Sequence, residues 1–197
     1  RGTNNGKNFL GPQITIISPT RDFYESLLPK FRNKLNFHWA LEALEENSYS
    51  SKDDISDETT LSKTLDDATD DTSAHNQSSI VFLLETDEKQ KFLFTGDAGR
   101  DAFNHVPQTL LGKVKDVTWM KVPHHGSKHN LDSTIIKHVN PEIAYISTEK
   151  QGKYLNRSTV FALKKNGTKV YSTSQNRSTI RHGAIKTREG WTKIEPM

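Results

Sequence analysis

Two short turns hold the residues best suited to chemistry: Asp97 in the first, and the pair His124 and His125 in the second. The first turn follows the apolar run 92–94, and the second follows the run 117–122. Both runs are strand-like and end at Gly or Pro, so the acid and the imidazoles are expected just past two strand ends. A carboxylate and neutral imidazoles suit Zn²⁺ or a similar divalent ion, whose bound water becomes a nucleophile near neutral pH.

Each of these residues also has a purely structural interpretation. Asp97 could cap the helix that follows it, because Asp is a favoured N-cap residue, and one oxygen can cap while the other binds metal. His124 and His125 could be loop histidines bonded to the backbone, although Gly126 beside them indicates a close backbone approach. Adjacent side chains cannot easily bind one ion in the same way. One histidine is therefore expected as a ligand and the other as a proton donor or supporting group, and both assignments stay open.

The pattern of apolar residues alternates between strand and helix periods, which predicts an α/β layered fold. The expected strands are 14–17, 78–85, 89–95, 116–122, 142–147 and 170–173, with the second and third forming a hairpin. The expected helices are 21–35 with an interruption at Pro29, 38–45, one after Gly99 that carries Phe103, 130–139 and 158–166. Residues 107–115 are expected to be a linker or short helix, and 180–186 with 191–194 a final hairpin.

Composition limits how much of the chain can form a core. Of its 197 residues 32% are hydrophobic, and the mean hydropathy is −0.74. These values are low for a chain that must fill a core by itself, so part of it is expected to be disordered. The segment 47–76 is rich in Ser, Asp, Glu and Thr, which predicts a disordered acidic insert. Its run 66–71 lacks the Gly and the closing Glu of a calcium loop, which favours a solvated acidic loop over calcium binding.

Cysteine content and hydropathy bear on the metal donors and the compartment. The chain has no cysteine, so any metal site must use His and carboxylate, and a cytoplasmic location is expected. No apolar run approaches about 18 residues, so no membrane-spanning segment is predicted.

Charge is distributed unevenly along the chain. Residues 1–100 hold 11 Lys and Arg against 17 Asp and Glu, whereas residues 101–197 hold 16 against 7. A basic second half beside a metal site suits a polyanionic substrate such as nucleic acid, because phosphate neutralisation supplies most non-specific affinity. The alternative is a solvated surface that balances an acidic loop.

Three segments together carry a resemblance to a known family. Residues 76–84, 91–97 and 121–127 resemble the second half of a metallo-β-lactamase-fold hydrolase, as in the metallo-hydrolase domain of bacterial competence DNA-uptake channels and in phosphorylcholine esterases. The similar part covers roughly 10–20 and 76–185. The resemblance implies an αββα sandwich with a mixed sheet flanked by helices, one or two Zn²⁺ ions or alternatively Mn²⁺, an Asp97 that bridges two metals, and metal-site roles for His124 and His125.

The chain also departs from that family in two places. The family's principal metal motif, His-x-His-x-Asp-His, is absent, and the chain opens on Arg1 without an initiator Met. Residues 1–197 are therefore interpreted as the C-terminal half of one domain, and the remaining ligands are expected from an N-terminal half in the same or a separate chain. Where relatives usually show Tyr-Gly-His-Pro, residues 154–157 are Tyr-Leu-Asn-Arg. Asn156 thus replaces a His, which predicts either an altered site or a weakened enzyme.

Five residues near these motifs are candidates for substrate binding. His129 could contact a substrate phosphate, Lys128 could attract it, and Arg157 could fork onto it, although Arg157 could equally be a surface charge at a helix start. Four further histidines are expected to be structural: His38, His105, His138 and His182. The candidate substrate-binding set is Ser127, Lys128, His129, Asn156 and Arg157.

These features predict a hydrolase that uses metal-activated water on phosphodiesters, with nucleic acid as the expected substrate. His124 or His125 would complete the metal shell or protonate the leaving oxygen. Two alternatives use the same residues. One is a non-catalytic module of the same fold that binds nucleic acid or a partner protein, and the other is a hydrolase of small esters or thioesters.

Overall fold

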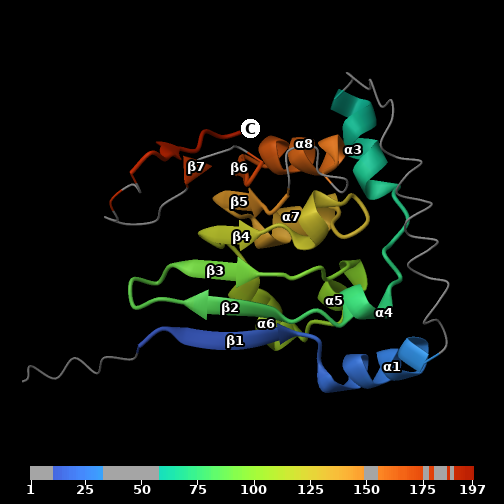
Figure 1. Ribbon diagram of the computed structural model, residues 1–197. Coiled ribbons are helices and arrows are strands. Elements are labelled where there is room, and N and C mark those ends of the chain that lie inside the picture. Colours follow the sequence, from blue (N-terminus) through green and yellow to red (C-terminus); the bar gives the residue numbers. More distant parts are fainter. Residues whose placement is uncertain (1–10, 33–57, 149–154, 175–177, 180–185, 187–188) are drawn as a thin grey trace, which may run out of the picture.

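The computed structural model describes residues 11–32, 58–148, 155–174, 178–179, 186 and 189–197. Its centre is a six-stranded mixed sheet in the order β1-β2-β3-β4-β5-β6 (Figure 1). The strands β1, β2 and β3 are antiparallel neighbours, and β3 to β6 run parallel. The strands are β1 Gln13–Ser18, β2 Val81–Glu85, β3 Lys91–Phe94, β4 Trp119–Lys121, β5 Ile143–Ile146 and β6 Lys169–Ser172.

Short helices accompany the sheet, so the described chain is of mixed α/β class. They are α1 Arg21–Arg32, α3 Glu58–Asp66, α4 Ala74–Gln77, α5 Arg100–Asn104, α6 Gln108–Leu111, α7 Ser133–Val139 and α8 Arg157–Lys165, with single 3₁₀ turns η1 Gly112–Val114 and η2 Pro123–Gly126. Figure 1 shows α3, α4 and α5 near the end of the sheet toward which the parallel strands point. None of the described helices is both long and apolar enough to cross a bilayer.

One face of the sheet builds the hydrophobic core. Alternate residues of each strand point to this face, among them Leu83, Leu93, Met120 and Ala144, all fully buried. Buried side chains from α1, α5, α7 and α8 belong to the same cluster. The helices on this face therefore hold the parallel strands in register and fix where their ends lie.

The opposite face of the sheet is apolar and aromatic but only partly covered. Phe82 stacks on Phe94 with ring centroids 4.6 Å apart, and Trp119 lies 5.2 Å from Phe94 and 6.1 Å from Tyr145. On the edge strand β1, Ile14 is 64% exposed and Ile16 54% exposed. An apolar sheet face left open in this way is typical of a surface that another layer covers.

Most expected elements are present with shifted ends. The predicted hairpin is β2 and β3, the predicted strands 116–122, 142–147 and 170–173 correspond to β4, β5 and β6, and the predicted helices 130–139 and 158–166 correspond to α7 and α8. The helix expected at 21–35 is a single helix that includes Pro29. The predicted helix 38–45 lies outside the described residues.

One segment differs from the expectation, and one expected element falls mostly outside the described residues. Part of the predicted disordered insert 47–76 is structured, because 58–66 and 74–77 are helical and Leu65 is fully buried. Its first part, 47–57, lies outside the described residues. At the C-terminus, Ser178–Thr179 (β7) pairs with Thr192–Lys193 (β8) in parallel, and the expected hairpin of 180–186 with 191–194 stays a prediction. Residues 180–185 lie outside the described part.

Candidate active site

The two turns singled out from the sequence lie against each other. They follow the ends of the neighbouring parallel strands β3 and β4. The backbone N–H of His124 donates to the carbonyl oxygen of Gly96 over 3.3 Å. Lys121 Nζ donates to the same carbonyl and lies 3.4 Å from Asp97 Oδ1. The Gly96 turn and the His124 turn therefore form one polar cluster at the end of the sheet.

Asp97 does not occupy the N-cap position of the next helix. Gly99 is the N-cap of α5, so the alternative structural role for Asp97 is not the one the chain uses. The Asp97 N–H donates to Ser79 Oγ over 3.2 Å, and its side chain is 40% exposed. Burial lowers the pKa of Lys121, and the nearby Asp97 carboxylate offsets part of this effect.

The histidine turn has a strained backbone. His124 has φ 42° and ψ 51°, and His125 has φ 56° and ψ 21°, so two successive non-glycine residues adopt the left-handed conformation. Each such residue costs about 1 to 2 kcal/mol. Gly126 follows with φ 90°, and a side chain there would press on Ile146 and Leu155. Strain of this kind is retained where the surroundings enforce it, which is common at functional sites.

Both imidazoles have Nδ1 directed at oxygen acceptors. His124 Nδ1 lies 3.2 Å from Asn130 Oδ1 and 3.4 Å from Asp71 Oδ2. His125 Nδ1 lies 2.5 Å from the Ser147 carbonyl oxygen. A proton on each Nδ1 satisfies these contacts, and in that tautomer the lone pair of each ring is on Nε2.

His124 and Asp71 shift each other's pKa. Burial opposes protonation of His124, but the hydrogen bond and charge of Asp71, with the charge of Asp97, outweigh it and raise the pKa of His124 above 6.5. Burial likewise raises the pKa of Asp71, but hydrogen bonds from His124, Asn130, Asn76 and Ser73 dominate and lower it below 3.8. The two shifts are consistent with a buried ion pair.

Asp71 and Asn130 are the site residues that sequence reasoning missed. Asp71 is 9% exposed and Asn130 is fully buried. Asp71 belongs to an acidic run whose composition predicted solvent exposure, and Asn130 stood only as the start of a predicted helix. One available signal was Ser73, the N-cap of α4, whose side chain accepts from the Asn76 N–H and which marks a helix start inside the supposed insert.

Lys128 and His129 share a hollow on the side of α3. The hollow has a volume of about 410 Å³ and is also lined by Lys63, Thr64 and Thr69. His129 Nδ1 lies 2.7 Å from the Thr69 carbonyl oxygen. Ser127 is buried, and its hydroxyl accepts the His129 N–H over 3.2 Å, so it supports the loop. A substrate-binding role for these three residues stays a prediction.

Asn156 begins α8. Its Oδ1 accepts the Ser158 N–H over 2.9 Å, so Asn156 is the N-cap. Its own N–H donates to the Gly126 carbonyl oxygen over 3.2 Å, which brings the start of α8 beside the histidine turn. Arg157 is exposed on the first turn of α8. Substrate contacts from Asn156 and Arg157 stay predictions.

Two further histidines of the described chain, His105 and His138, have contacts elsewhere. His105 Nδ1 lies 2.8 Å from the Asp101 carbonyl oxygen, and its ring stacks on Phe23 at 4.2 Å. His138 Nε2 lies 3.0 Å from the Leu111 carbonyl oxygen. These contacts agree with the structural roles expected for both. His38 and His182 lie outside the described residues.

The donor chemistry at the two turns fits a divalent metal, but the donors are too few. Metal-binding histidines usually donate their second ring N–H to a carboxylate or carbonyl, and Nδ1 of His124 and His125 lies beside a carboxylate and a carbonyl oxygen respectively. Within the described ranges, however, no three His, Cys, Asp or Glu residues gather in a way that could hold a metal ion. Any metal bound by Asp97 and the histidine turn would need ligands from outside the described residues.

Comparison with known proteins gives one similarity. The chain is 30% identical over 128 residues to ComE operon protein 3 of Bacillus subtilis (strain 168), a match that spans 64% of this chain and 16% of that protein. The chain therefore corresponds to a small part of the curated relative. No family model matches it, and no solved structure does.

Proposed function

Starting from the similarity to ComE operon protein 3, we propose that this chain is the C-terminal half of a metallo-β-lactamase-like hydrolase that cleaves phosphodiesters, with nucleic acid as substrate. The observation that carries the proposal is the contact between the turns of Asp97 and His124 at adjacent strand ends. A carboxylate and two oriented imidazoles are the groups that metal-assisted hydrolysis uses.

The missing donors are assigned to an N-terminal half that packs on the aromatic face of the sheet. Phe82, Phe94, Trp119 and Tyr145 make this face apolar, and the described residues leave it partly uncovered. Two sheets that pack face to face would bury it and produce the αββα sandwich. A partner in this position also explains why three suitable donors do not come together within the described chain.

The residues at the rim would divide the work as follows. Asp97, His124 and His125 would hold one or two Zn²⁺ ions, which supply an activated water and offset charge on the phosphate oxygens. One imidazole could instead protonate the leaving oxygen, and the roles of the two histidines stay open. Lys121, half-buried beside Asp97, keeps that carboxylate oriented. The positive excess in residues 101–197 favours an anionic substrate.

The test uses the full-length gene product in two variants. Asp97→Ala should lose hydrolysis of a phosphodiester such as bis-p-nitrophenyl phosphate by more than about 100-fold and lower the bound zinc, because a metal ligand is removed. Asp87→Ala is the matched control, since Asp87 is exposed in the turn between β2 and β3. Full zinc content together with full activity in Asp97→Ala would reject the proposal.

Asn156 is the reason to test a second function, that of a non-catalytic binding module, in the same assay. Where the resembling family has a His, this chain has a helix N-cap, so the fold could serve as a non-catalytic module that binds nucleic acid. Chelator-resistant DNA binding without cleavage would favour that module. Hydrolysis of small esters or thioesters without cleavage of DNA would favour the small-substrate hydrolase.

A further inference from the structure

We propose that Asp71 is a positioning residue for His124. Asp71 lies in the segment 58–77, which runs from α3 to α4 and is called the arm below, and this segment places the Asp71 carboxylate beside the His124 ring. Together with Asn130, Asp71 holds the His124 ring with its proton on Nδ1, so that Nε2 is the nitrogen offered to a divalent cation. The inference rests on the proposed metal chemistry of His124, but the ring geometry stands independently of it.

The first step is the orientation of the Asn130 amide. Its Nδ2 faces three oxygens: Asp71 Oδ2 at 2.9 Å, the Asp97 carbonyl at 3.1 Å and the Ala98 carbonyl at 3.4 Å. A nitrogen surrounded by acceptors must be the donor end, so the other end of the amide is the oxygen. Asn130 Oδ1 therefore faces His124 Nδ1 as an acceptor.

The second step is the carboxylate of Asp71. Its Oδ2 lies 3.4 Å from the same His124 Nδ1, so that nitrogen has two oxygen acceptors beside it. The opposite tautomer would place a lone pair against both oxygens. Asp71 is itself held by the Ser73 N–H at 2.9 Å and by Asn76 Nδ2 at 2.8 Å. The carboxylate therefore cannot turn away without breaking several hydrogen bonds.

The third step is the backbone of Asp71, which is fixed on both sides. Its N–H donates to the His129 carbonyl oxygen over 3.1 Å. Its carbonyl oxygen accepts from Gln77 Nε2, and Gln77 Oε1 accepts the Ala102 N–H over 3.0 Å. A side chain at Gly99 would collide with the Gln77 amide, so the glycine allows this approach.

Arg100 connects the arm to the loop that follows the histidine turn. Its guanidinium is nearly fully buried and donates to the carbonyls of Leu65 at 2.7 Å and Ala68 at 2.9 Å on the arm. It also donates to the carbonyls of Lys128 and Leu131 on the loop, each at 3.0 Å. In Figure 1 the chain between α3 and α4 runs along that end of the sheet. The acidic segment is thus part of the site's framework.

The test compares Asp71→Asn with Asp67→Asn as matched control, since Asp67 is an exposed acid of the same arm. Nitrogen-15 spectra of the histidine rings in metal-free protein, at a pH where His124 is neutral, distinguish the two tautomers. Wild type and Asp67→Asn should show His124 with the proton on Nδ1, and Asp71→Asn should show a mixture. Zinc affinity should fall about 10- to 100-fold in Asp71→Asn only.

Two results would overturn the inference. One is a wild-type His124 with its proton on Nε2, which needs no variant to be observed. The other is an Asp71→Asn protein that keeps the wild-type tautomer. Absence of zinc binding in the wild type would contradict the proposed function instead, while the tautomer comparison would still decide the role of Asp71.

Discussion

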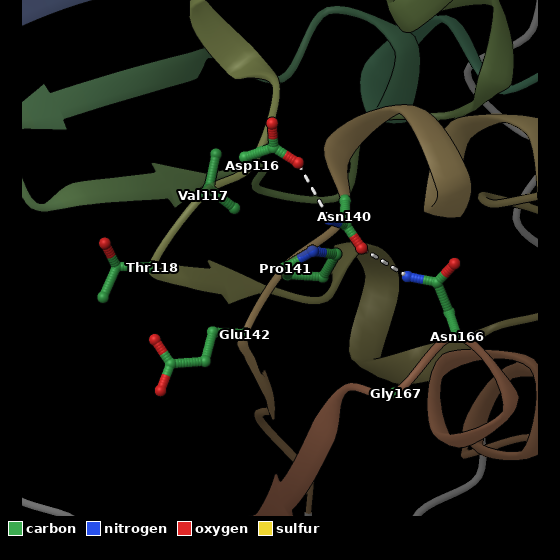
Figure 2. A pocket seen from close by; sticks show the side chains of 8 residues that line it. All are labelled: Asp116, Val117, Thr118, Asn140, Pro141, Glu142, Asn166 and Gly167. Atoms are coloured by element: carbon green, nitrogen blue, oxygen red, sulfur yellow. Dashed lines mark hydrogen bonds between the residues drawn. The ribbon is translucent and has the colours of Figure 1, made fainter.

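The two ends of the parallel strands carry similar residues in different settings. At the end where the strands begin, Asp116 Oδ1 accepts from Asn140 Nδ2 at 2.8 Å, and Asn140 Oδ1 accepts from Asn166 Nδ2 at 3.0 Å (Figure 2). This hollow of about 310 Å³ is also lined by Glu142 and Gly167. It is exposed, and its side chains form a chain of bonds with one another. At the other end, Asn130 is fully buried.

Both ends combine a carboxylate, amides and residues with positive φ, so these features do not distinguish them. The ends differ in how deeply the polar side chains are buried and in whether segments distant in the sequence meet there. Asp116 and Asn140 adopt positive φ, as do His124 and His125. Only the candidate site, however, joins segments as distant in sequence as Asp71 and Asn130 around an imidazole. Polar residues in a hollow thus do not identify a site by themselves, whereas buried polar groups from several segments that face one side chain do.

The largest expected contrast comes from one asparagine at each end. Asn130→Ala would remove one of the donors to the buried Asp71 carboxylate and the side-chain donor to the Asp97 and Ala98 carbonyls, and should lower the free energy of unfolding by about 4 kcal/mol. Asn166→Ala removes one exposed hydrogen bond and should cost about 0.5 kcal/mol. Urea denaturation of the metal-free protein measures both. Equal losses would show that the two ends are energetically alike.

A pair of glycines gives the next contrast. Gly126 and Gly167 have φ of 90° and 87°, so alanine is strained at both. At Gly126 the added Cβ would also lie 3.2 Å from Ile146 and 3.3 Å from Leu155, whereas at Gly167 nothing lies within 4 Å. Gly126→Ala should cost about 3 kcal/mol and Gly167→Ala about 1 kcal/mol by thermal or urea unfolding. A loss at Gly126 no larger than that at Gly167 would mean that the histidine turn can shift away from Ile146 and Leu155 at little cost in free energy.

The smallest expected effect is the pH dependence of stability in metal-free protein. The pKa of His124 is raised above 6.5, so its contribution is present below pH 6.5 and is lost as pH rises through the folded-state value. The pKa of Asp71 is lowered below 3.8, so its contribution is present above pH 3.8 and is lost as pH falls through the folded-state value. This pair should therefore stabilise the fold most between those limits.

Unfolding free energies measured from pH 6 to pH 9 check the alkaline side. The decrease with rising pH should shrink in His124→Gln, because glutamine does not titrate. The control His138→Gln, on α7, should keep the wild-type decrease, since its Nε2 contacts the Leu111 carbonyl and not the Asp71 network. An unchanged decrease in His124→Gln would assign the pH dependence to another group.

Local patterns in the sequence were sufficient for the strands, the hairpin and the two turns. The apolar, strand-forming residues of 81–85 and 91–94 predict strands. Gly96 ends the second of these runs and Pro123 ends the run 117–122, because of their backbone geometry. The sequence also placed Asp97 and His124 just past two strand ends, and the structure shows that these strands are parallel neighbours whose ends share one edge of the sheet.

Only the tertiary structure decided how these side chains are used. Asp71 was expected to be solvated because it lies in an acidic run, and composition alone gives no information on tertiary contacts. It could not show that Asn130, far along the chain, donates a buried hydrogen bond to the Asp71 carboxylate. Asn156 was expected from the sequence as a substrate contact, and the structure adds a second role that the sequence did not indicate, because its side chain caps the start of α8. Periodicity reports which face a residue lies on, but hydrogen-bond partners depend on which segments fold together, and that is settled by long-range packing.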